Sequence, residues 1–110
     1  MQITQDGEYY KVWYVTGPRH NFLALSFTSR TGVVLPKITA LPPVGGCVHE
    51  PLDPDEIARA VLSGVEEANQ ELKTSYQVSE IQYVTNDTPS EIVYAFLAAR
   101  IVRSHHCEVD

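Results

Sequence analysis

The longest regular pattern of apolar and polar positions in the chain spans residues 53–76. Apolar side chains recur there every three or four residues, and the charged side chains fall mostly on the other side of the helical cylinder. Asp53 suits the N-cap, Pro54 suits the first helical position, and Glu56 can reach back to the cap amide. The pattern predicts an amphipathic helix with one face on the core. Its core-facing residues are Ile57, Val61, Val65 (or Gly64), Ala68 and Leu72.

Two segments in the first third of the chain alternate as β-strands do. Residues 8–16 are rich in aromatic and β-branched side chains, and residues 22–29 alternate between large apolar side chains and small or polar ones. A Gly-Pro turn signal within residues 17–21 separates them, so we predict an antiparallel pair. One face of the first strand carries Tyr9, Lys11, Trp13 and Val15, and the other carries Tyr10, Val12, Tyr14 and Thr16.

Two further strands are predicted at residues 33–41 and 77–85. Pro36 removes a ladder donor from the former, which favours an edge position or a bulge. Strict alternation in the latter places Val78 and Ile81 on opposite faces. We expect the first three strands to form a meander, to which the fourth is added after the first helix.

A second, more apolar helix is predicted over residues 89–102, with Thr88 as its cap, Pro89 as its first residue and its apolar positions from Ile92 to Val102. Residues 104–110 read as a flexible polar tail. The sequence therefore predicts a single α+β domain over residues 1–110. It has an antiparallel sheet of about four strands with two helices packed on one face, in the order β-β-β-α-β-α.

Composition supports one soluble domain. The chain has 110 residues, of which 44% are hydrophobic and 20% charged, as in ordinary globular proteins. No apolar run is long enough to span a bilayer, and the N-terminal sequence lacks the order of a signal peptide, so we expect a cytoplasmic protein without membrane attachment. Only two cysteines are present, which favours reduced thiols over a disulfide scaffold.

The charge distribution disfavours nucleic acids as partners. The formal net charge is -6, with four basic and two acidic residues in 1–40 but four basic and twelve acidic residues in 41–110. Binding to a phosphate backbone needs clustered Lys and Arg, which this pattern does not supply.

A metal site is a weaker alternative for the Cys and His residues. Thiolate and imidazole are the ligand types that zinc prefers, but the spacing here matches no standard zinc motif. A disulfide is equally open, because sequence alone does not bring two cysteines within bonding distance. We expect no cofactor and no metal. The candidates for the alternative site are Cys47, His49, His106 and Cys107, beside His105 in the tail.

A small-ligand or catalytic site is the second functional hypothesis. His20 lies between Arg19 and Asn21, and a histidine titrates near neutrality, so it can serve as a general base while Arg19 holds an anion. Asp87 or Glu50 can orient the imidazole. The pocket would lie between the long loop 42–52 and the sheet. The catalytic candidates are His20, Cys47, His49 and Asp87.

The favoured hypothesis is a non-enzymatic interaction protein. No phosphate-binding glycine loop, catalytic triad order or paired-carboxylate signature is present, which favours a protein that is not an enzyme. With two helices on one side of the sheet, the aromatic side chains of the first strand are free to contact a partner protein or a second copy. The predicted interaction surface consists of Tyr9, Lys11, Trp13 and Phe22.

Overall fold

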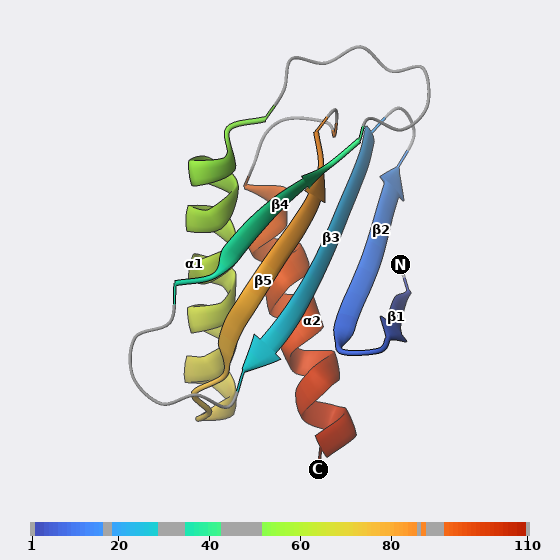
Figure 1. Cartoon of the computed structure of the whole chain (residues 1–110). Coiled ribbons are helices and arrows are strands. Elements are labelled where there is room, and N and C mark those ends of the chain that lie inside the picture. The colour runs from blue at the N-terminus through green and yellow to red at the C-terminus, as the bar shows by residue number, and fades with distance from the viewer. Residues whose placement is uncertain are drawn as a thin grey trace.

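The computed structural model of the protein describes residues 2–16, 19–28, 35–42, 52–85, 87 and 92–109. Within these ranges the chain forms five strands and two helices, of the predicted α+β class (Figure 1). No helix in the described ranges is both long enough and apolar enough to cross a membrane. The elements are β1 (Ile3–Asp6), β2 (Tyr9–Thr16), β3 (Arg19–Thr28), β4 (Lys37–Leu41), α1 (Pro54–Leu72), β5 (Gln77–Val84) and α2 (Val93–Val109).

The sheet is mixed, with the strand order β1-β2-β3-β5-β4. The predicted antiparallel pairing of β2 and β3 is confirmed, and β1, a short strand that the sequence analysis did not predict, pairs with the outer edge of β2. The predicted meander is wrong, because β5 lies between β3 and β4 and pairs with β4 in parallel. The reason is that α1 connects β4 to β5, and a helical crossover returns the chain to the same end of the sheet. β4 occupies an edge, as Pro36 indicated.

Both helices lie on one face of the sheet and pack against each other (Figure 1). α1 contacts β4 and β5, and α2 contacts β2 and β3. The large residues that form the core lie between these layers and are removed from solvent almost completely, which is the main favourable term in folding. They include Val12, Leu23, Leu25, Ile57, Val61, Ile81, Tyr83, Tyr94, Leu97 and Ile101.

A β-bulge in β5 explains which residues of this strand face the core. The register changes between Ser26, which pairs with Glu80, and Phe27, which pairs with Val78, so Ser79 is an extra residue in the ladder. The extra residue puts Val78 on the same face as Ile81, and both belong to the buried core. The strict alternation expected from the sequence was therefore wrong for this strand.

The first helix follows its predicted start and ends earlier than its predicted end. The Asp53 carboxylate accepts a hydrogen bond from the amide of Asp55 at 2.9 Å, so the predicted cap is confirmed. Glu56 accepts a hydrogen bond from Arg59. The helix ends at Leu72 and is followed by the C-cap residue Lys73, whose φ of 58° is left-handed. A left-handed residue stops the α-helical ladder, so residues 74–76, which were predicted as helical, lie outside the helix.

The second helix is longer than predicted and includes most of the residues expected to form a tail. The ring of His105 stacks on Phe27, with centroids 4.6 Å apart, and meets the edges of Tyr10 and Tyr76. The Tyr76 hydroxyl and His106 Nδ1 are 2.8 Å apart. These contacts bind the last turns of α2 to the sheet, a tertiary effect that the polar composition conceals. The predicted cap residues 88–91 lie outside the described ranges.

Gly64 sets the distance between the two helices. A Cβ atom at this position would lie 2.0 Å from the backbone oxygen of Ala95 on α2. We expect Gly64→Ala to lower the free energy of unfolding by about 2 kcal/mol, because the helices must separate and loosen the core beneath them. Urea denaturation measures this change. Ser63→Ala, at the exposed neighbouring position, is the control, and equal stabilities of the two variants would contradict the close approach.

Candidate functional site

The sheet face away from the helices carries the residues predicted as an interaction surface. Trp13 and Val15 are exposed to 49% and 66%, whereas Tyr10 and Val12 on the same strand are buried under the helices. The predicted division of this strand into two faces is thus observed. We call the side without helices the open face, because neither helix covers it (Figure 1).

An apolar strip crosses one end of the open face. Trp13 pairs with Phe22 in the register of β2 and β3, and their ring centroids are 4.4 Å apart. Phe22 is only 4% exposed and belongs to a small cluster with Ala24 and Val84, against which Leu41 packs. Phe22 therefore contributes support beneath Trp13 and little exposed area of its own.

The opposite end of the open face is polar and is organised by Glu80. Its carboxylate accepts hydrogen bonds from Tyr9 at 2.7 Å, from Thr39 at 3.0 Å and from Gln82 at 3.1 Å. The hydrogen bond from Tyr9 lowers the pKa of Glu80 and raises the pKa of Tyr9. Lys11 forms an ion pair with Asp6 of β1 at 2.9 Å. Side chains from four strands are therefore tied together on this surface.

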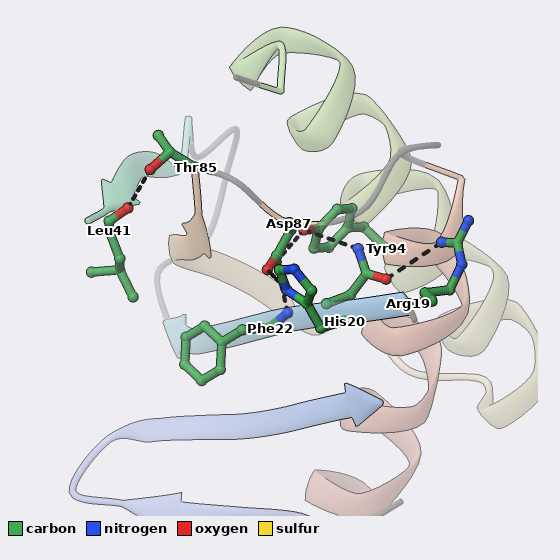
Figure 2. A network of polar contacts seen from close by, with 8 residues as sticks. Arg19, His20, Phe22, Leu41, Thr85, Asp87 and Tyr94 are labelled. Carbon is green, nitrogen blue, oxygen red and sulfur yellow. Dashed lines mark hydrogen bonds and ion pairs between the residues drawn. The ribbon is translucent and has the colours of Figure 1, made fainter. Parts of the chain in front are cut away.

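A second cluster of polar side chains is buried beside the first residues of β3 (Figure 2). Asp87 is completely buried, and its Oδ2 accepts a hydrogen bond from the amide of Phe22 at 2.7 Å and from the hydroxyl of Tyr94 at 2.5 Å. Phe22 immediately precedes Leu23, the first residue of β3 that pairs with β5. The carboxylate therefore takes the place of a strand partner for this amide.

His20 and Asn21 extend the cluster toward the surface. Nδ1 of His20 lies 3.3 Å from Oδ1 of Asp87. Asn21, also completely buried, donates to the Tyr94 hydroxyl at 3.4 Å and accepts from Arg19 at 3.4 Å. The segment expected as a turn, residues 19–21, instead begins β3, because it pairs with the end of β2.

Burial dominates the electrostatics of this cluster. Removal from water disfavours the carboxylate and raises the pKa of Asp87, although the hydrogen bonds from Phe22 and Tyr94 and the neighbouring His20 act in the opposite direction. Burial likewise raises the pKa of Tyr94. A neutral phenol that donates to a buried carboxyl group is therefore the stable arrangement at neutral pH.

The structure brings together two of the predicted catalytic candidates, His20 and Asp87. A carboxylate beside an imidazole can hold the ring in one orientation, which is the arrangement of a base and its orienting group. The other candidates, Cys47 and His49, lie outside the described residues, as does Glu50. Two surface hollows of the described ranges are lined by neither His20 nor Asp87.

Two of the four residues proposed for a metal site, His106 and Cys107, lie in the part of the chain that the structure describes. His106 and Cys107 lie on α2, where His106 contacts the Tyr76 hydroxyl and Cys107 is an exposed free thiol. In the part of the chain that the structure describes, no three Cys, His, Asp or Glu side chains are grouped as metal ligands. Cys47 and His49 are outside that part.

Tyr94 and Glu80 are the principal site residues that the sequence analysis missed. Tyr94 occupies a fully buried position on α2, and a buried tyrosine hydroxyl usually has a hydrogen-bond partner, so its position in an apolar helix was a usable signal. Glu80 had no such signal, because two of its three described donors, Tyr9 and Thr39, come from other strands.

Asp87 is expected to be essential for stability. Asp87→Ala leaves the Phe22 amide and the Tyr94 hydroxyl without their acceptor in a buried environment, and should lower the free energy of unfolding by about 3 kcal/mol. Guanidinium denaturation followed by circular dichroism measures the loss. Glu67→Ala, at an exposed position of α1, is the control and should change stability little. Wild-type stability of Asp87→Ala would exclude a structural role for the carboxylate.

The raised pKa of Asp87 also predicts a pH dependence. A carboxyl group with a higher pKa in the folded state binds more protons there, so its contribution to stability falls as pH rises from about 4, the unfolded value, through the raised value. The free energy of unfolding of the wild type minus that of Asp87→Asn should therefore decrease with increasing pH over this window. Measuring both in a His20→Gln background removes the imidazole from the comparison. A difference that rises with pH would contradict the assignment.

Comparisons with known proteins add no functional assignment to this geometry. No protein-family model matches the chain, and no curated protein or solved structure is significantly similar to it. The open face and the buried Asp87 cluster are therefore the observations from which a function has to be inferred.

Proposed function

We propose that the protein is a non-enzymatic interaction protein that self-associates through the open face of its sheet. The observation that carries this proposal is the half-exposed Trp13 beside the exposed Val15 on a face that neither helix covers. Tryptophan is enriched at the centres of protein interfaces, because its large apolar ring gains free energy when it leaves water.

Trp13 is held in place before any partner arrives. Its ring rests on the buried Phe22, and every residue of its strand, β2, pairs with a residue of β3. A side chain that is already ordered loses little conformational entropy on binding. The apolar strip is therefore suited to act as the anchor of an interface.

The charges at the two edges of the open face favour a second copy as the partner. The register aligns Asp6, Tyr9, Ser26, Glu80 and Lys37 in one row, which begins with an acid on β1 and ends with a base on β4. A two-fold axis parallel to β3 would place β1 of one copy over β4 of the other. Each Asp6 would then face Lys37 of the second copy, so the charges are complementary at both edges.

The same symmetry operation also matches the apolar strip with itself. A two-fold axis parallel to the strands keeps each row at its own level, so Trp13 of one copy meets Val84 and Leu41 of the other. Two sheets that pack face to face do so with their strands roughly 30° apart, which twisted strands accommodate. The apolar and the charged ends of the face are thus both self-complementary.

A small-ligand or catalytic role remains the second candidate, supported by the contact between His20 and Asp87. Its ligand would be an anion held near Arg19, in the pocket predicted between loop 42–52 and the sheet. Titration with phosphate or acetate, followed by NMR of the His20 ring, tests it. The candidate fails if the ring resonances do not respond to either anion.

Trp13 is expected to control self-association. Sedimentation equilibrium should detect a dimer of the wild type, and Trp13→Ala should weaken it by about tenfold or more. Because Trp13 is the only tryptophan, its fluorescence should also shift to shorter wavelength as concentration rises. Leu62→Ala, which removes an exposed apolar side chain from α1, is the control. A wild-type chain that is monomeric at its highest soluble concentration would refute self-association.

The charge arrangement gives a separate test of the orientation. Asp6→Lys and Lys37→Asp should each weaken the dimer, because each brings like charges together at both edges, and the double exchange should restore its affinity. The loss of the exposed ion pair between Lys11 and Asp6 should affect folding little. Analytical ultracentrifugation measures all three variants. A double variant as weak as the single ones would exclude this arrangement.

A further inference from the structure

A groove between β1 and α2 is separate from both the open face and the Asp87 cluster. It has a volume of about 470 Å³ and lies where the free edge of the sheet passes beside the second half of α2. Among the residues that the structure describes, the charged side chains that line it are two arginines. Its described lining residues are Gln2, Ile3, Arg100, Arg103, Ser104 and Cys107.

The backbone of β1 presents hydrogen-bonding groups along this groove. β1 is the outermost strand and is joined to β2 by a two-residue turn, in which Gly7 has a φ of 62°. In such a hairpin, Asp6 and Tyr9 close the turn as a hydrogen-bonded pair, and hydrogen-bonded and non-bonded pairs then alternate. Gln5 and Ile3 therefore direct their N–H and C=O groups outward, away from β2.

Arg100 gives the groove a local positive charge, because the other arginine of the lining, Arg103, is already paired with a carboxylate of the same chain. Arg103 binds Glu71 of α1 through two hydrogen bonds, of 2.8 Å and 3.2 Å. Arg100 is exposed and forms no ion pair with any described residue. The guanidinium of Arg100 is thus available to a carboxylate from outside, even though the whole chain carries a net charge of -6.

We propose that this groove docks an extended acidic segment of a partner protein, which adds to β1 as a further strand. Its backbone would pair with the outward groups of Ile3 and Gln5. Side chains alternate between the faces of a sheet, so every second residue of the segment would point toward α2, where a carboxylate meets Arg100. Main-chain pairing supplies affinity, and the arginine selects for acidic side chains.

The charge of the groove argues against a second copy of this chain as its occupant. Pairing of β1 with β1 of another copy would place the grooves side by side about a two-fold axis. Arg100 of each copy, unpaired among the described residues, would then approach that of the other, and like charges at an interface oppose association. A strand of opposite charge has no such penalty.

The test uses a fluorescein-labelled peptide of alternating Thr and Glu, about eight residues long, and the matching peptide of Thr and Lys. Fluorescence anisotropy should show binding of the Glu peptide and not of the Lys peptide. Arg100→Glu should weaken binding by about tenfold or more. Arg59→Glu makes the same charge change on α1 and should leave the affinity unchanged. Equal binding of both peptides, or no binding of the Glu peptide, would overturn the proposal.

A proline tests the strand addition itself. Gln5→Pro removes an N–H group that points outward and leaves the pairing with β2 intact. It should therefore lower the affinity for the Glu peptide by about tenfold or more. Gln5→Val keeps this N–H group and should bind as the wild type does. Circular dichroism confirms that both variants fold. Unchanged binding by a folded Gln5→Pro variant, or peptide-induced NMR shifts that avoid the amides of Ile3 and Gln5, would refute docking at this edge.

Discussion

The close contact between α1 and α2 is the constraint on which the rest of the structure depends. Because Gly64 has no side chain, the backbone of α2 at Ala95 can approach α1 directly. Two helices packed this closely fit side by side over one face of the five-stranded sheet, and together they bury the large residues of β2, β3 and β5. A wider separation would leave gaps over the central strands.

One consequence of this one-sided packing is that the other surfaces of the sheet must be stable in contact with water. The open face meets this requirement through polar pairing around Glu80 and through the support that Phe22 gives Trp13. The outer edge of β1 is stable in water because the strand is short, which limits indiscriminate edge-to-edge pairing. The surfaces that could bind partners are therefore the ones that the helices do not reach.

The buried cluster around Asp87 shows how one side chain can serve the fold and resemble a catalytic group. Its carboxylate links the start of β3 to α2 through Phe22 and Tyr94, and the same group contacts His20. Three interactions, two with β3 and one with α2, explain why the carboxyl group is retained in the interior despite the cost of its burial. The same carboxylate thus lies beside His20, as an orienting group lies beside a base, and also holds β3 to α2.

Local patterns in the sequence were sufficient for the α+β class, the start of α1, the pairing of β2 with β3 and the set of residues that share a face with Trp13, because these depend on periodicity and capping within a few residues. They offered Asp87 and Glu50 as alternatives to orient His20, and they missed Tyr94. Only the tertiary structure decided the insertion of β5 between β3 and β4, the bulge at Ser79 and the full length of α2. These features depend on contacts between residues far apart in the chain, such as His105 with Phe27, and such contacts leave no periodic signal in either segment.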